Sequence, residues 1–284
     1  MIATHASRRN FLGGIGAFAA AAGAAAGAAP AAASGADAAG FKLGVASYSL
    51  RAYSRRTAIS IVKKLGVQYI NIKDFHLPMT LTPEEMRAAS AEFTKAGLTI
   101  LGGGTVDFKK DDESDFKMKF EYAKNAGMPL IVAAPSAETL PKLEKYVKQY
   151  NIKLAVHNHG TEDKTFPNPQ AVLKIVKDMD PRVGCCVDIG HTVRTGVDII
   201  ETIREVGPRL LDMHTKDLAD TLKRDSQVVV GEGKIPIAGL FKELLKMNYT
   251  GGVMLEYEID EDNPVAGMQR GFAYMRGVVA GLKA

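Results

Sequence analysis

The stretch "TPEEMRAASAEFTKAGLTILGGGTV", residues 82–106, contains one complete helix-and-strand unit. Apolar residues recur at intervals of three and four through 82–97, and Thr82 followed by Pro83 is a helix start signal, so this part predicts an amphipathic helix. The run "ILGGGTV" (100–106) predicts a buried strand. Its glycines lack the G-x-G-x-x-G spacing of a dinucleotide-binding turn, and they indicate a close backbone approach or a tight turn.

The same unit recurs along the chain from residue 44. The strand-like runs are "GVASYSL" (44–50), "YINIKDF" (69–75), "ILGGGTV" (100–106), "LIVAAP" (130–135), "KLAVHNH" (153–159), "GCCVDIG" (184–190), "LLDMHTK" (210–216) and "GVMLEYE" (252–258). Segments of helical period separate them, so residues 41–284 are predicted to form a single-domain α/β fold, the (β/α)8 TIM barrel. An open doubly wound sheet is the competing architecture, but "SYSLRAYSRR" after the first strand is not a glycine-rich phosphate turn.

The first forty residues have a different character. The segment "SRRNFLGG" precedes an Ala/Gly-rich apolar run and then "AAPAAASGADA". This order predicts a twin-arginine signal peptide and linker over residues 1–40, cleaved after Ala33 or Ala38, and therefore a periplasmic or secreted protein without a stable membrane anchor. A disordered or membrane-anchoring N-terminus is the alternative.

The amino-acid composition limits the kinds of partner that the protein is expected to bind. The 284 residues are 46% hydrophobic and 24% charged, which suits one substantial core. The formal charge of +4 falls to +3 once Arg8, Arg9 and Asp37 are removed, and this bias is too weak to imply binding to nucleic acid. Adjacent Cys185 and Cys186 would point to opposite faces of a strand, which predicts two packed thiols. Assembly into a homo-oligomer stays open.

The histidines of the predicted barrel share one location. All five lie at, or just past, the carboxyl end of a predicted strand: His76, His157, His159, His191 and His214. Catalytic groups of (β/α)8 enzymes lie at this end of the barrel. The histidines therefore predict a functional site there.

Two carboxylates stand in apolar strand sequence at the same end, Asp188 in "CCVDIGH" and Glu256 in "VMLEYE". A buried carboxylate must pair, take up a proton or bind a cation. An ion pair with Lys73 or Lys216 is one interpretation. A metal site is the favoured one, because imidazoles and carboxylates converge from several strands.

The motifs "VDIGHT", "MHTKDL", "GEGKIP" and "LEYE" resemble, in this order, the xylose isomerase-like TIM barrels. This superfamily of metal-dependent sugar isomerases and epimerases also holds inosose dehydratases and endonuclease IV, and the resemblance covers roughly residues 42–282. It implies a small carbohydrate substrate and one divalent ion, manganese first, with zinc, cobalt or iron as alternatives. The implied ligands are His157, Asp188, His214 and Glu256.

One position departs from the family pattern. Epimerases of this kind usually carry Glu-Asn-His where this chain has "HNHG" (157–160), so His157 replaces a carboxylate ligand. A neutral imidazole still binds a metal ion, but the two-carboxylate proton relay is weakened. The predicted catalytic residues are therefore Glu256, His159, His191, Lys216, Lys73 and His76, and the predicted substrate contacts are His76, His191, Lys216 and Glu232. For Lys73 and His76 a loop charge and a capping histidine are the alternative, and Glu232 could equally be a loop carboxylate.

Two enzyme functions follow from the resemblance. The first is isomerisation or epimerisation of an unphosphorylated sugar through a metal-bound enediolate. The second is metal-assisted β-elimination by a 3-keto-glycoside lyase or hydratase, since "NIKDFHLP" with "HNHG" also resembles exported members of the superfamily with that activity. A non-catalytic sugar-binding barrel is a third class. An endonuclease fits poorly, because it would need a three-zinc cluster and a basic groove.

Overall fold

The computed structural model of the protein describes residues 40–284. The predicted signal segment, 1–40, therefore lies almost entirely outside the described residues, and its cleavage and the export that it implies stay predictions. Within the described range, no helix combines the length and the apolar character needed to cross a bilayer.

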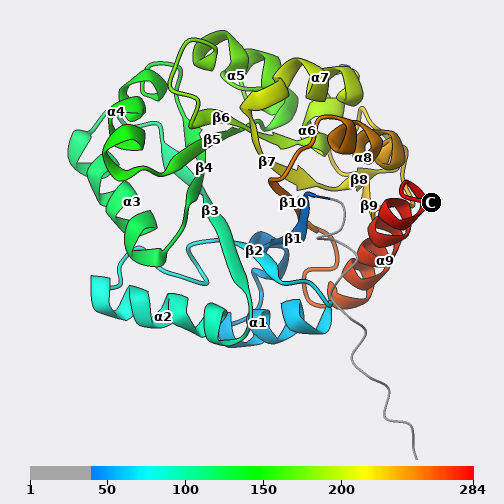
Figure 1. Ribbon diagram of the computed structural model, residues 1–284, viewed down its shortest axis with the longest axis horizontal. Coiled ribbons are helices and arrows are strands. Elements are labelled where there is room, and N and C mark those ends of the chain that lie inside the picture. The colour runs from blue at the N-terminus through cyan, green and yellow to red at the C-terminus, as the bar shows by residue number, and fades with distance from the viewer. Residues whose placement is uncertain (1–39) are drawn as a thin grey trace, which may run out of the picture. The chain divides into compact units, whose positions relative to one another are not determined.

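Eight parallel strands close into a barrel in the order β1-β10-β7-β6-β5-β4-β3-β2 (Figure 1). The strands are β1 (Lys42–Ala46), β2 (Tyr69–Ile72), β3 (Thr99–Phe108), β4 (Leu130–Pro135), β5 (Lys153–His157), β6 (Val183–Asp188), β7 (Leu210–Thr215) and β10 (Gly252–Leu255). Two short antiparallel strands, β8 (Asp217–Leu218) and β9 (Gln227–Val228), lie outside the barrel order. The predicted (β/α)8 fold is confirmed.

Helices follow the strands and surround the barrel (Figure 1). They are α1 (Arg55–Lys64), α2 (Pro83–Lys95), α3 (Glu113–Ala126), α4 (Leu140–Tyr150), α5 (Pro169–Val176), α6 (Ile189–Val193), α7 (Ile199–Val206), α8 (Ile237–Lys246) and α9 (Val265–Gly281). The predicted helix start at Thr82 is confirmed, and it takes the form of a capping box: the Thr82 side chain accepts the Glu85 N–H, and the Glu85 carboxylate accepts the Thr82 N–H.

The glycines of "ILGGGTV" lie within β3, which continues to Phe108. A Cβ on Gly104 would lie 2.1 Å from the Val132 carbonyl oxygen, and a Cβ on Gly103 would lie 2.4 Å from the Met128 sulfur. The predicted close backbone approach is confirmed, and it brings β3 against β4 at the end of the barrel where the histidines lie.

The first strand is shorter than "GVASYSL" suggested. It ends at Ala46, and Ser47–Leu50 form a 3-10 turn. Serine hydroxyls replace the ladder hydrogen bonds: Ser47 Oγ accepts the Lys73 N–H at 2.8 Å, and Ser49 Oγ donates to the Leu255 carbonyl at 3.2 Å. The turn thereby ties the carboxyl end of β1 to both neighbouring strands.

The barrel interior changes from apolar to polar along its axis. Leu130, Val132, Ala155 and Cys186 form one buried cluster inside it. Both cysteines are buried free thiols, as predicted. Farther along the strands the buried side chains are polar, and they include Asp188 and His214.

The "GEGKIP" segment after β9 is tied to the barrel by Asp217. This carboxylate, 1% exposed, accepts backbone N–H groups of Leu218 at 2.9 Å, Gly231 at 2.9 Å, Gly233 at 3.0 Å and Ile235 at 3.0 Å. Buried backbone donors of a loop need such acceptors. The Asp217 side chain therefore holds this segment at three of its backbone N–H groups.

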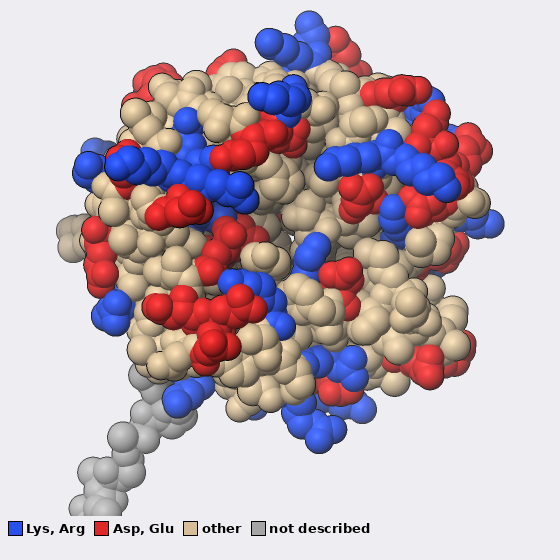
Figure 2. Space-filling view, turned by 180° about the vertical axis from the view of Figure 1, so that it is seen from behind, with Lys and Arg blue, Asp and Glu red and all other residues tan. Residues whose placement is uncertain are grey.

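Charged side chains are mixed on the molecular surface. Figure 2 shows lysine and arginine side chains interspersed with aspartate and glutamate over one face of the described residues.

Candidate metal centre and active-site cavity

Four predicted ligands meet at the carboxyl end of neighbouring strands. His157 and Asp188 end β5 and β6, His214 lies on β7, and Glu256 directly follows β10. Asp188 pairs in register with His214, and His157 pairs with Cys186 two residues before Asp188. One ligand atom from each of the four residues lies within 4.8 Å of the other three, and all four residues are buried.

The interatomic distances fit a shared ion. His157 Nε2 lies 3.0 Å from His214 Nδ1 and 3.6 Å from Asp188 Oδ2, and Glu256 Oε1 lies 3.2 Å from His214 Nδ1. Ligand atoms at about 2.1 Å from one tetrahedral ion lie about 3.4 Å apart. Asp188 Oδ2 is buried and accepts no hydrogen bond, although the Lys216 ammonium lies 3.0 Å from it. The donor set, two imidazoles and two carboxylates, therefore fits a divalent ion.

A lysine lies beside the two carboxylates. Lys216 Nζ is 3.0 Å from Asp188 Oδ2 and 3.0 Å from Glu256 Oε2, and it also pairs with Glu258. The ion pair weighed as an alternative for Asp188 and Glu256 thus forms with Lys216. Lys73 instead donates to the Thr105 carbonyl at 2.7 Å. The lysine contacts one edge of the cluster, whereas the imidazole nitrogens face its centre.

The charge states suit cation binding. Burial tends to raise the pKa of both Asp188 and Glu256, but the neighbouring histidines and Lys216 outweigh it, so each carboxyl pKa is well below its usual value. Burial lowers the pKa of His157 to about 4. For His214 burial acts in the same direction, but the Glu256 carboxylate prevails and raises the pKa to about 9. At neutral pH both carboxylates are anions, and His157 is already neutral.

The sulfur atom of Cys186 lies close to the ligand histidines His157 and His214. Cys186 forms a second group with His157 and His214 in which the ligand atoms are within 4.8 Å. Burial and nearby carboxylates raise the pKa of this thiol well above its usual value, so it stays protonated in the absence of an ion. Sequence reasoning assigned Cys186 to the core and did not anticipate that it lies this close to the ligands.

A cavity of about 660 Å³ opens over the cluster. Its walls combine predicted site residues with residues not foreseen: Tyr48, Lys73, Gly104, Thr105, His157, His159, Glu162, His191, Arg194, Leu218, Arg224, Asp225, Gln227, Glu256, Glu258 and Ile259. Glu258, Arg194 and Tyr48 were missed. Glu258 stands two residues after Glu256 in "LEYE", and this spacing could have indicated it.

His159 and His191 lie together in the cavity wall, with ring centroids 5.8 Å apart. Burial lowers the pKa of both, so both are neutral at pH 7. Arg194 Nη1 lies 2.9 Å from His191 Nδ1. Because a guanidinium group can only donate, His191 Nδ1 accepts this hydrogen bond. The proton of the neutral His191 ring therefore resides on Nε2.

Three predicted catalytic or substrate-contacting residues do not line the cavity. Lys216 is buried against the Asp188 and Glu256 carboxylates, and His76 and Glu232 lie elsewhere. His76 is 1% exposed and does not line the cavity; its Nδ1 lies 2.9 Å from Ser47 Oγ, and its Nε2 faces the Leu50 and Tyr53 carbonyls at 3.2 and 3.1 Å. The turn after β2 places this ring against the 3-10 turn, which favours the alternative of a capping histidine, and the assignment of His76 to catalysis and substrate binding stays a prediction. Glu232 also lies outside the cavity and pairs with Arg270 at 3.1 Å, because Asp217 fixes its loop.

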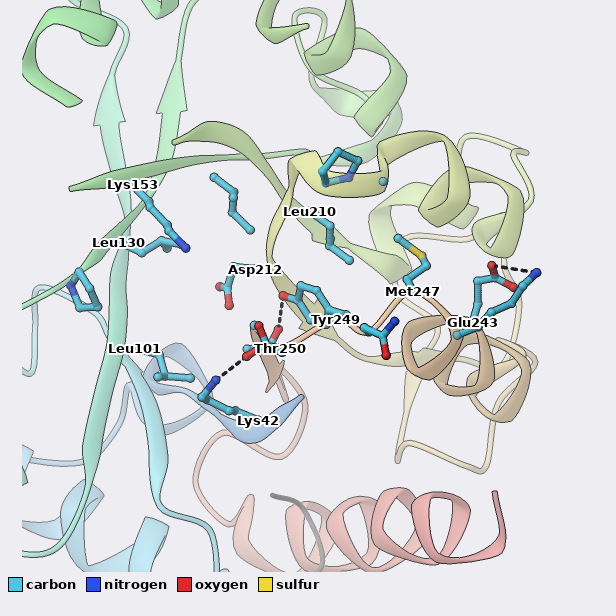
Figure 3. A pocket seen from close by; sticks show the side chains of 18 of the residues that line it. Lys42, Leu101, Leu130, Lys153, Leu210, Asp212, Glu243, Met247, Tyr249 and Thr250 are labelled. Atoms are coloured by element: carbon cyan, nitrogen blue, oxygen red, sulfur yellow. Dashed lines mark hydrogen bonds and ion pairs between the residues drawn. The ribbon is translucent and has the colours of Figure 1, made fainter. Parts of the chain in front are cut away.

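A second cavity, of about 860 Å³, opens at the other end of the barrel. Figure 3 shows Lys42, Lys153 and Asp212 around it, and Lys42 and Lys153 begin their strands. Catalytic residues of (β/α)8 enzymes lie at the carboxyl ends of strands. The smaller cavity, which contains the ligand cluster, is therefore the candidate active site.

Comparison with known sequences agrees with the fold. The sequence profile of a family described as xylose isomerase-like TIM barrel matches residues 59–278. An inosose dehydratase of Mesomycoplasma hyopneumoniae (strain 7448) is 29% identical over 164 residues, which cover 51% of this chain and 54% of that protein. The chain thus spans about half the length of the curated relatives it matches.

Solved structures share the fold over most of the chain. A crystal structure of the IOLI protein with a zinc atom has a TM-score of 0.71 at 19% identity, covering 85% of this chain and 99% of that one. A D-psicose 3-epimerase with D-tagatose, from Clostridium cellulolyticum H10, has a TM-score of 0.68 at 17% identity, covering 84% and 99%. At these identities the likeness shows the fold alone.

Proposed function

Since the chain belongs to the xylose isomerase-like TIM barrel family, we propose that it is a metal-dependent enzyme that removes a proton from the carbon beside the carbonyl of an unphosphorylated sugar. The observation that carries this proposal is the convergence of four buried ligand atoms within 4.8 Å, at the floor of a cavity that also holds two neutral histidines. The inosose dehydratase relatives support a carbohydrate substrate.

The proposed ligands of the ion are His157, Asp188, His214 and Glu256. A divalent ion bound there supplies a Lewis acid that polarises the sugar carbonyl. Mixed nitrogen and oxygen ligation favours manganese, zinc, cobalt or iron over magnesium or calcium. Manganese is our first assignment, and zinc is the first alternative because a protein of the same fold contains zinc.

His159 is the proposed base. It lines the cavity, its pKa is lowered by burial, and its ring centroid lies 4.4 Å from that of His157. A neutral imidazole beside the ligand cluster can accept a proton from a carbon next to the polarised carbonyl. Lys73 lines the same cavity and is proposed to stabilise the negative oxygen that develops on the substrate.

The site supports elimination best. His157 Nε2 faces the ligand cluster, and both Glu256 oxygens are engaged, by His214 and by Lys216, so neither position offers a free carboxylate for a two-carboxylate relay. His159 and His191 instead lie on one side, close enough to act on adjacent substrate atoms.

In a 3-keto-glycoside, His159 would take the proton from C2, and the electron pair of that C–H bond would form the C1–C2 double bond. The glycosidic C1–O bond breaks, and the leaving oxygen accepts a hydrogen bond from His191 Nε2–H. The proton held by His159 then passes to that oxygen, so an alcohol and an unsaturated keto-sugar leave. No oxidant or reductant is needed.

Isomerisation or epimerisation is the second candidate. It begins with the same proton removal by His159, but the proton returns to carbon and every C–O bond stays intact. The cavity is also lined by the Glu258 carboxylate, which pairs with Lys216 and could return the proton to carbon from another direction.

One NMR experiment separates these outcomes. Protein loaded with Mn²⁺ is incubated in deuterated water with free ketoses and with 3-keto-glycosides. Release of the alcohol supports elimination, and deuterium in an otherwise intact sugar supports isomerisation or epimerisation. Protein that binds carbohydrate but neither holds an ion nor turns over would instead be a sugar-binding barrel, and the proposal would fail.

The location of this activity is also proposed. The twin-arginine segment predicted at residues 1–40 would deliver the protein to the periplasm or the medium, where unphosphorylated sugars are the available substrates. Fusion of residues 1–40 to a reporter that is active only after export would test this.

A further inference from the structure

Lys216 Nζ lies among three carboxylates, and they are not equivalent. Asp188 and Glu256 belong to the proposed ion site, whereas Glu258 does not belong to the group of converging ligand atoms. The Lys216 ammonium donates hydrogen bonds to Glu256 and Glu258, but it makes only an electrostatic contact with Asp188, at 3.0 Å. Glu258 is therefore the one carboxylate that would stay available to Lys216 when an ion binds.

Asp188 Oδ2 is the atom at which the lysine and the ion meet. It lies 3.0 Å from Lys216 Nζ and 3.6 Å from His157 Nε2, which faces the centre of the ligand cluster. Glu256 is divided differently: Oε2 faces the lysine, and Oε1 faces His214. An ammonium and a divalent cation that contact the same oxygen repel each other.

The lysine side chain is built into the fold. Lys216 is 3% exposed, and its aliphatic part crosses Gly190 at the start of α6. A Cβ on Gly190 would lie 2.6 Å from Lys216 Cγ and 2.7 Å from Cδ. Only glycine leaves room for this path, so the ammonium is held at the carboxylates by packing as well as by charge.

The charges of the three carboxylates explain why the Lys216 ammonium is held beside them. Buried carboxylates without a counter-ion are strongly unfavourable. Lys216 provides one positive charge against the three carboxylates around it, and a divalent ion would provide the two that remain. The site is thus arranged for the lysine and the ion together, with Glu258 as the carboxylate left to the lysine.

We propose that Lys216 is a tethered counter-cation that occupies the carboxylate side of the ion site, and that Glu258 holds its ammonium when a divalent ion engages Asp188 and Glu256. This inference rests on the ion site of the proposed function. It assigns Glu258 a positioning role that acts through Lys216, and it makes the Lys216–Glu258 pair a determinant of metal affinity.

A double-mutant cycle on metal-stripped protein tests this, with MnCl2 titrated into each variant by calorimetry. Lys216→Met should lower the Mn²⁺ dissociation constant by at least about tenfold, because a repelling cation is removed. Glu258→Gln should raise it by about tenfold, because the ammonium then rests on Asp188 and Glu256 alone. In the double variant the effect of Glu258→Gln should disappear, because there is no ammonium left to hold.

The alternative is a simple loss of negative charge at Glu258. That would weaken Mn²⁺ binding equally with and without Lys216, and such additivity would overturn the proposal. Equal or weaker binding by Lys216→Met would also overturn it. Lys63→Met, an exposed lysine on α1, is the matched charge control and should leave the constant unchanged.

Thermal melts provide a readout that does not depend on turnover. Metal-free Lys216→Met should melt below wild type, and Mn²⁺ should raise its melting temperature more than it raises that of wild type. If Lys216→Met does not fold, an unchanged dissociation constant in Glu258→Gln would still refute the role of Glu258. Wild-type protein that binds no Mn²⁺, Zn²⁺ or Co²⁺ would remove the ion site itself, and this proposal with it.

Discussion

Asp217→Asn should strongly destabilise the protein, because one carboxylate holds the segment after β9. Asp217 Oδ2 accepts the N–H groups of Gly231 and Gly233, and Oδ1 accepts those of Leu218 and Ile235. In asparagine one of these oxygens becomes an NH₂ group, which turns two acceptor contacts into donor–donor contacts. Hydrogen bonds to a charged group contribute about 1.5–3 kcal/mol each, so the loss should be about 3–5 kcal/mol.

That loss is a large part of the roughly 5–15 kcal/mol that stabilises a typical domain. Urea unfolding followed by circular dichroism measures it directly. Asp220→Asn is the matched control: its carboxylate accepts the Leu222 N–H at 3.0 Å in a more exposed turn, and we expect a change below about 1 kcal/mol. An Asp217→Asn variant within 1 kcal/mol of wild type would show that the segment is held in another way.

Three further changes test the site and the barrel. At neutral pH a divalent ion must displace the His214 proton, because the Glu256 carboxylate outweighs burial and raises the pKa of His214 to about 9. The Mn²⁺ dissociation constant should therefore fall about tenfold per pH unit from about pH 6.5 to 8.5 and level off above pH 9, and a constant independent of pH in calorimetry would contradict this. His159→Gln should lower kcat by about 10²- to 10⁴-fold while bound metal, measured by elemental analysis, is unchanged; near-normal turnover would exclude His159 as the base. Gly104→Ala should lower the unfolding free energy by about 3 kcal/mol or more, because its Cβ would lie 2.1 Å from the Val132 carbonyl oxygen. Gly97→Ala, where a Cβ meets nothing within 4 Å, should cost only about 1 kcal/mol, and equal losses would refute the packing argument.

The barrel could be predicted because local patterns and the overall fold agree. In residues 82–106 the helix start at Thr82, the apolar spacing and the following strand each appear in the structure as expected. The four proposed ligands could be located for a related reason. Parallel strands in a closed barrel end on the same side, so polar residues at strand ends meet without any knowledge of side-chain conformation.

Side-chain direction could not be predicted. His76 follows a strand just as His159 does, but the turn after β2 buries its ring against Ser47. The position of Lys216 depends on the space above Gly190, which belongs to another strand–helix unit. Neither sequence spacing nor composition contains this information.

The proposed ligands and the facing wall of the cavity come from different parts of the barrel. Among residues 40–284 the converging ligands come from β5, β6, β7 and the end of β10, which are consecutive neighbours in the closed sheet. The opposite wall of the cavity is formed by residues that follow β1 and β2 or lie on β3, such as Tyr48, Lys73 and Thr105. This wall can therefore be changed without altering any proposed ligand, and a chimera joined within α4 would exchange the wall and keep the proposed ion site.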